Sequence, residues 1–252
     1  MQENKYDELG FFQKYAKMDR SRFGLAGAAE WPTLQKILPD FHHKEVLDLG
    51  CGYGWHCKYA AEQGAKRVLG IDISQRMLAL AKEKNAAPNI VYQCMAMEDL
   101  QLPAASFDVV FSSLAFHYVA DFPAMIKKIQ RWLKEDGQLI FSVEHPVFTS
   151  YGSQDWYYDE KGQILHFPVD HYYEEGARKA HFLGETVCKY HRTLTTYFDT
   201  LLQQGFCLQH IVEPKPPAAM LDLPGMRDEL RRPMMLLISA KKISNPLPPM
   251  RG

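Results

Sequence analysis

Three glycines at alternate positions follow an acidic residue in the stretch VLDLGCGYGWH, residues 46–56. Asp48 interrupts an apolar segment, and Gly50, Gly52 and Gly54 lead into a helical pattern. Glycine lets a backbone turn sharply and approach a ligand closely, because it has no Cβ. A plain turn between a strand and a helix needs only one such residue. The three glycines therefore predict a loop that holds a ligand beyond the carboxyl end of a strand.

A second acid, Asp72, ends the next apolar segment, VLGIDIS, 22 residues after Gly50. A carboxylate at about this distance accepts hydrogen bonds from both hydroxyls of a ribose. A dinucleotide is disfavoured, because Trp55 stands where the third glycine of a G-x-G-x-x-G loop belongs and Asp48 would repel a diphosphate. Asp48 suits a cationic group, such as the ammonium of an amino acid. These residues predict a nucleoside ligand with a positive end and no diphosphate, and S-adenosylmethionine fits that description.

Strand and helix patterns alternate between residues 45 and 145 and must position this loop. Apolar strands that alternate with helices favour a parallel sheet covered on both faces. The expected strands are Glu45–Gly50, Arg67–Asp72, Ile90–Cys94, Phe107–Ser112 and Gly137–Glu144. The expected helices between them are Trp55–Gln63, Ser74–Asn85 and Phe122–Lys134.

Ten aromatic residues crowd residues 146–191, where regular periodicity is lost, so we expect a cap over the sheet edge rather than a separate domain. Apolar spacing then predicts an amphipathic helix from Leu194 to Gly205, followed by two last strands. We expect one domain over residues 1–252. Its parts are an N-terminal helical lid (1–42), a cofactor-binding core (43–145), a cap or insertion (146–191), the last helix and strand pair (192–243) and a tail (244–252).

Composition disfavours several classes of function. A net charge of −1 leaves no basic field to attract nucleic acid or an anionic membrane. No uncharged apolar run approaches the roughly 18 residues of a membrane span, and the first residues lack a secretory pattern. The five cysteines never form a CxxC pair, which favours reduced thiols over a disulfide framework or a zinc site. We expect a cytoplasmic protein with no metal and with no nucleic-acid or membrane partner.

Taken together, the motifs resemble those of the class I (Rossmann-like) S-adenosylmethionine-dependent methyltransferases of small molecules, of the type 11/25-like family. VLDLGCGYG matches the first motif and VLGIDIS the motif after it. MAMEDLQLPAASFDVVFSSLAFHYV matches the segment from the adenine contact to the fourth strand, and LKEDGQLIFSVEHP matches the fifth-strand motif. The resemblance implies an α/β fold with a doubly wound, mostly parallel seven-stranded sheet whose last strand is antiparallel. It also implies an N-terminal helical lid and an aromatic-rich insertion after strand 5.

The resemblance further implies which residues hold the cofactor. The glycine loop lies against the methionine part, and Asp48 holds the ammonium end, directly or through water. Asp72 binds the ribose, and Ile73 and Met77 pack on the adenine. Ala96 stands where the family usually has an acid for the adenine amino group. The other residues expected at the cofactor are Tyr15, Met18, Arg20, Ala96, Met97, Glu98, Ser112, Ser113 and Leu114, with Arg20 paired to the cofactor carboxylate.

Methyl transfer needs few catalytic residues, because a sulfonium already activates the methyl group and the protein mainly positions the nucleophile and excludes water. A general base helps only where the acceptor carries a proton to lose. His117 and His145, after the fourth and fifth strands, are the candidates for this base or for an acceptor contact, with packing or capping as the alternative. The candidates for an acceptor pocket are Tyr151, Trp156, Tyr157 and Tyr190.

We therefore expect an S-adenosylmethionine-dependent methyltransferase (EC 2.1.1.-) that acts on an O, N or C nucleophile of a small molecule and releases S-adenosylhomocysteine. The sequence leaves the acceptor and the oligomeric state open. Two alternatives also remain open: a dinucleotide-dependent oxidoreductase on a similar fold, and a Rossmann-like cofactor-binding protein without methyl transfer.

Overall fold

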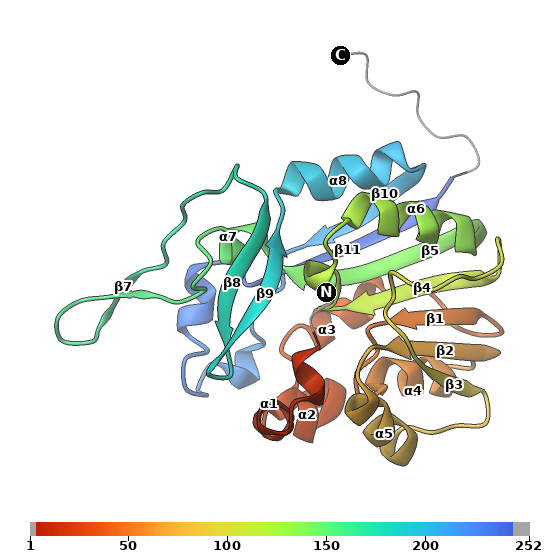
Figure 1. Ribbon diagram of the computed structural model, residues 1–252, viewed down its shortest axis with the longest axis horizontal. Helices are drawn as coiled ribbons and strands as arrows, with labels where there is room; N and C mark the ends of the chain where they lie inside the picture. Colours follow the sequence, from red (N-terminus) through yellow and green to blue (C-terminus); the bar gives the residue numbers. More distant parts are fainter. Residues whose placement is uncertain (1–3, 244–252) are drawn as a thin grey trace.

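A seven-stranded sheet forms the centre of the computed structural model, which describes residues 4–243 (Figure 1). The strand order is β10-β11-β5-β4-β1-β2-β3, and β11 runs antiparallel to both of its neighbours while the other pairs are parallel. The expected doubly wound fold with an antiparallel last strand is confirmed. The strands are β1 (Glu45–Leu49), β2 (Arg67–Asp72), β3 (Ile90–Cys94), β4 (Phe107–Ser113), β5 (Leu133–Glu144), β10 (Phe206–Val212) and β11 (Met235–Lys242).

Helices cover both faces of this sheet (Figure 1). One face packs against α3 (Trp31–Leu34), α4 (Trp55–Glu62) and α5 (Gln75–Lys84), and the other against α6 (Phe122–Trp132) and α8 (Leu194–Gln203). Helix α6 shows why the sequence folds this way. Its apolar side chains at Phe122, Met125, Ile126 and Ile129 are all buried, on one helical face.

The N-terminal segment consists of short helices, α1 (Leu9–Tyr15), α2 (Asp19–Arg22) and α3, with a 3-10 turn at Gly24–Gly27 between the last two. Phe11 of α1 is buried against Ala180 and Val187 of the insertion. Lys14 forms an ion pair with Glu185 at 3.0 Å. The N-terminal segment and the insertion therefore hold each other in place.

The insertion after β5 is more regular than the sequence suggested. It contains α7 (Pro146–Thr149), a short hairpin of β6 (Tyr157–Tyr158) and β7 (Ile164–His166), and a longer hairpin of β8 (Gly176–Phe182) and β9 (Glu185–His191). Residues 176–191 therefore form two paired strands although regular periodicity is absent from their sequence. Figure 1 shows β7 projecting away from the sheet, whereas β8 and β9 lie beside the ends of the central strands.

The chain between β10 and β11 is irregular and holds two 3-10 turns, Ala218–Met220 and Asp228–Arg231. We call residues 213–234 the C-terminal loop. Within residues 4–243, helices are too short or too polar to cross a membrane. The tail expected at residues 244–252 lies outside the described residues.

Candidate active site

A cavity of about 950 Å³ opens beyond the carboxyl ends of β1, β2, β4 and β5. Its walls come from the N-terminal helices, the loops after these strands, the β8–β9 hairpin and the C-terminal loop. Small-molecule sites span roughly 300–1,000 Å³. A cavity at the upper end of that range has room for two small ligands side by side.

The glycine loop and Asp72 form one hydrogen-bonded unit at this cavity. The backbone N–H of Gly52 donates to one carboxylate oxygen of Asp72 at 2.8 Å, and that of Ser74 donates to the other at 2.9 Å. Burial raises the pKa of Asp72 to about 6, while these two hydrogen bonds act to lower it. Asp72 is therefore ionised at neutral pH and lies in the cavity wall as a hydrogen-bond acceptor.

Only part of the glycine loop faces the cavity. Gly50, Gly52 and Gly54 all have positive φ angles, of 74°, 53° and 75°. A Cβ on Gly54 would lie 2.2 Å from the hydroxyl of Tyr92, so that glycine is required by packing. A Cβ on Gly52 would meet only the end of Met77, at 3.4 Å. The space beside Gly52 is cavity, which fits a backbone that a ligand approaches closely.

Thirteen of the sixteen residues expected at the cofactor line the cavity. They are Tyr15, Met18, Arg20, Gly50, Gly52, Asp72, Ile73, Met77, Ala96, Met97, Glu98, Ser113 and Leu114. The three that do not are Asp48, Gly54 and Ser112. Ser112 is buried, and its hydroxyl donates to the Leu49 carbonyl at 2.8 Å, which ties β4 to β1.

Asp48 is buried against helix α4 rather than exposed in the cavity. The Cys57 thiol donates to one of its carboxylate oxygens at 3.2 Å, and the other oxygen has no hydrogen-bond partner among the described residues. Burial raises the pKa of Asp48 to about 7. The geometry therefore disfavours a direct contact between Asp48 and a cofactor in the cavity.

Arg20 lines the cavity but is already paired. One of its terminal nitrogens donates to both carboxylate oxygens of Glu30, at 2.7 and 2.8 Å. Glu30 is almost completely buried. The positive charge of Arg20 is thus largely balanced within the protein before any ligand carboxylate arrives.

His117 is a buried side chain in the cavity wall, next to a network of polar groups. Its Nδ1 accepts a hydrogen bond from the Glu144 backbone N–H at 3.4 Å. Burial lowers the pKa of His117 to about 4, against the opposing charge of Glu144, so the ring is neutral at pH 7. Lys189 donates to Glu144 at 2.6 Å and to Gln154 at 2.9 Å, and Gln154 donates to Glu144 at 2.6 Å.

His145 lies outside the cavity lining. It caps helix α7, because its Nδ1 accepts from the Val147 N–H at 3.0 Å. Its Nε2 is 2.9 Å from a carboxylate oxygen of Glu213, and burial lowers the pKa of the ring, against the opposing charge of Glu213. The geometry favours the capping alternative for His145 over a contact with the acceptor.

The four aromatic residues expected in an acceptor pocket, Tyr151, Trp156, Tyr157 and Tyr190, are all absent from the cavity lining. Tyr151 and Tyr157 are exposed. Trp156 packs edge-on against Phe167, and Tyr190 lies beside the guanidinium of Arg192.

The C-terminal loop and the β8–β9 hairpin provide the walls that sequence reasoning missed. Phe182 and Lys189 line the cavity from the hairpin. From the C-terminal loop and the start of β11 come Pro214, Pro216, Met220, Leu223, Met226, Met234 and Met235. The clustering of methionines in an otherwise proline-rich loop is the sequence signal that could have revealed them, since methionine suits adaptable apolar binding surfaces.

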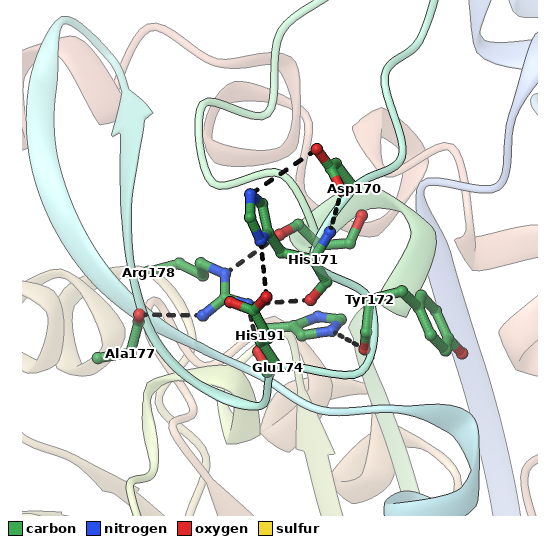
Figure 2. Close-up of polar contacts among 8 residues, drawn as sticks. Asp170, His171, Tyr172, Glu174, Ala177, Arg178 and His191 are labelled. Atoms are coloured by element: carbon green, nitrogen blue, oxygen red, sulfur yellow. Dashed lines mark hydrogen bonds and ion pairs between the residues drawn. The ribbon is translucent and has the colours of Figure 1, made fainter.

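Two histidines of the insertion, His171 and His191, make contacts within the insertion itself. His171 pairs with Glu174 at 2.9 Å, and Arg178 donates to the carbonyl oxygens of both residues (Figure 2). His191 bonds to the carbonyl oxygen of Tyr172 at 2.9 Å. Within the described part of the chain, no group of histidine, cysteine or acidic side chains is arranged to hold a metal ion.

Comparisons with known proteins agree with this geometry. A family model described as a methyltransferase domain matches residues 47–141. A solved structure assigned as an S-adenosylmethionine-dependent methyltransferase of Listeria monocytogenes is 58% identical, covers 87% of this chain and 99% of that one, and has a TM-score of 0.83. A second, from Mesorhizobium loti, is 40% identical, covers 87% and 100%, and has a TM-score of 0.80.

A curated relative is named ubiquinone biosynthesis O-methyltransferase, from Neisseria meningitidis serogroup C. It is 31% identical over 166 residues, which is 60% of this chain and 69% of the relative. This chain matches each of the two solved structures along almost the whole length of that structure. The matched family domain contains the glycine loop and Asp72. The chain therefore belongs to the class I S-adenosylmethionine-dependent methyltransferases.

Proposed function

We propose that this chain transfers the methyl group of S-adenosylmethionine to an O, N or C nucleophile of a small molecule held in the same cavity. The observation that carries the proposal is that one cavity joins the glycine loop and Asp72 to the neutral ring of His117. When bound, the cofactor supplies a methyl group that its positive sulfur has already activated. The protein then has only to hold both partners and exclude water.

The roles of the chain's own residues follow from their positions. Asp72 is ionised and would accept hydrogen bonds from two ribose hydroxyls, while Gly52 leaves room beside the methionine part. Met77 and Ile73 would pack on the adenine, as would the chain near Met97. His117 would contact the acceptor. In this proposal His145, Asp48 and the four aromatic residues of the insertion have supporting roles rather than ligand contacts.

A small-molecule acceptor, a cytoplasmic location and the absence of nucleic-acid or membrane partners are parts of the same proposal. Support comes from the near-neutral charge of the chain and from its five cysteines, all of which are free. The oxygen-methylating activity named for the Neisseria relative favours an oxygen acceptor among the three kinds of nucleophile.

The test is transfer of label from S-adenosylmethionine carrying a tritiated methyl group, with a small-molecule extract of the producing cells as the source of acceptors. The proposal predicts label in a low-molecular-weight product and an equal amount of S-adenosylhomocysteine, both dependent on the extract. An Asp72→Ala variant is the inactive control. Tight binding of S-adenosylhomocysteine with no transfer to any fraction would instead favour a cofactor-binding protein without methyl transfer.

A further inference from the structure

The acceptor end of the cavity has a wall of distinct composition. Six apolar side chains of the C-terminal loop and the start of β11 line it: Pro216, Met220, Leu223, Met226, Met234 and Met235. Phe182 faces the same cavity from the β8–β9 hairpin. Methionine adapts its shape to a ligand and makes favourable contacts with aromatic rings. This wall fits a flat, apolar molecule better than a sugar or an amino acid.

Three aromatic residues of the insertion, Phe148, Trp156 and Phe167, support the wall through Arg232. The guanidinium of Arg232 lies 4.6 Å from the ring centre of Phe148, 5.0 Å from that of Trp156 and 4.8 Å from that of Phe167. Arg232 also donates to both carboxylate oxygens of Glu229, at 2.7 and 3.0 Å. These contacts fix one end of a loop that has little secondary structure of its own, so the wall is positioned before a ligand arrives.

The polar groups at this end of the cavity offer donors and few free acceptors. The two carboxylates there, Glu144 and Glu229, already have both oxygens paired. Because Nδ1 of His117 accepts a hydrogen bond, the proton of the neutral ring is on Nε2. That Nε2 has no hydrogen-bond partner among residues 4–243, so it can donate to a ligand. Lys189 uses two of its three donors on Glu144 and Gln154.

We propose that the acceptor is a phenol-type molecule, an apolar ring with an ionisable hydroxyl, bound as its oxyanion between the methionine wall and His117 Nε2–H. This inference rests on the proposed function and names its substrate class. An oxyanion accepts hydrogen bonds without needing to give a proton away, which matches the donors present. In the transfer its oxygen forms the new bond to the methyl carbon, the carbon–sulfur bond breaks, and the sulfur keeps that electron pair. The positive and negative charges cancel, and no base is required.

The test uses 4-nitrophenol as the probe, because its phenolate absorbs visible light and its neutral form does not. The full-length protein is first saturated with S-adenosylhomocysteine, and binding of that ligand is measured by calorimetry. We expect 4-nitrophenol to bind to this complex as the phenolate, with visible absorbance rising at a pH where the free probe is partly neutral. Nitrobenzene, which lacks the hydroxyl, should bind at least roughly tenfold more weakly.

Variants assign the probe to the wall and to the histidine. The double variant Met220→Ser with Met226→Ser should weaken 4-nitrophenol binding roughly tenfold or more, because two apolar contacts are lost. Leu230→Ser is the matched control, since Leu230 belongs to the same loop, is exposed and does not line the cavity. His117→Phe should abolish the rise in absorbance. All variants should keep the wild-type affinity for S-adenosylhomocysteine.

The outcomes separate this inference from the proposed function. Failure of S-adenosylhomocysteine to bind would count against the proposed function itself. If S-adenosylhomocysteine binds, the acceptor class is overturned by any of three results. In the first, 4-nitrophenol does not bind or binds in its neutral form. In the second, nitrobenzene binds as tightly as 4-nitrophenol. In the third, Leu230→Ser weakens 4-nitrophenol binding as much as the double variant does.

Discussion

Replacing Gly52 by alanine distinguishes a loop that holds a ligand from a loop that only turns. The φ angle of Gly52 is 53°, in the left-handed region where an L-residue costs roughly 1–2 kcal/mol. The added Cβ would meet only the flexible end of Met77, at 3.4 Å. The free energy of unfolding of the ligand-free protein should therefore fall by only about 1–2 kcal/mol.

The effect on ligand binding should be separate from that loss of stability. The new methyl group would stand in the cavity beside the proposed methionine part of the cofactor. Overpacking by one such group costs about 1–3 kcal/mol, which weakens binding roughly 5- to 150-fold. Urea unfolding without ligand and calorimetric titration with S-adenosylhomocysteine measure the two effects independently.

Gly50→Ala is the matched comparison. Its φ angle is 74°, and the added Cβ would lie 2.5 Å from the Cβ of Ala115, so steric overlap adds to the backbone strain. This variant should lose about 2–5 kcal/mol of stability, more than Gly52→Ala. If Gly52→Ala keeps the wild-type affinity for S-adenosylhomocysteine, the loop does not approach that ligand and the reasoning is refuted.

Three other substitutions test the remaining residues. His117→Gln should lower turnover roughly tenfold or more while leaving S-adenosylhomocysteine affinity unchanged, and equal losses of both would indicate a structural role. Arg232→Met keeps the packing but removes the ion pair with Glu229, so the amide hydrogens of residues 214–226 should exchange faster with solvent. Unchanged exchange would contradict the role of Arg232 in fixing the C-terminal loop. Burial raises the pKa of Asp48 to about 7, so ionising it opposes folding and the unfolding free energy falls as pH rises from about 4 to 7. Asp48→Asn should remove up to ~4 kcal/mol of that fall, and parallel pH curves from urea unfolding would contradict it.

The cofactor half of the site could be predicted from the sequence because each of its parts is local. A glycine loop or an acid at the end of a strand is set by neighbouring residues, and parallel strands bring their carboxyl ends to one edge. Asp72 and Gly52 lie in the cavity for this reason. The pairing of Arg20 with Glu30 was not predictable in the same way, since it depends on how two short helices pack.

The acceptor half of the site could not be predicted, because its walls come from segments in which apolar and polar residues do not alternate with a helix or strand period. Strand β9 does alternate, but its buried positions hold Val187, Lys189 and His191, so no apolar alternation is visible. Phe148, Trp156 and Phe167 of the insertion pack against Arg232 and do not line the cavity, whereas Phe182 does line it. Strand β5 begins at Leu133 rather than Gly137, because Leu133 pairs with Phe107 of β4 and extends the strand.

The most direct measurement is calorimetric titration of the purified protein with S-adenosylmethionine and, separately, with S-adenosylhomocysteine, using NAD as the control. Binding of both nucleosides at one site per chain, without binding of NAD, is the predicted result. Binding of NAD alone, or of none of the three, would mean that the loop from Gly50 to Gly54 does not hold the cofactor, and it would contradict the proposed methyl transfer.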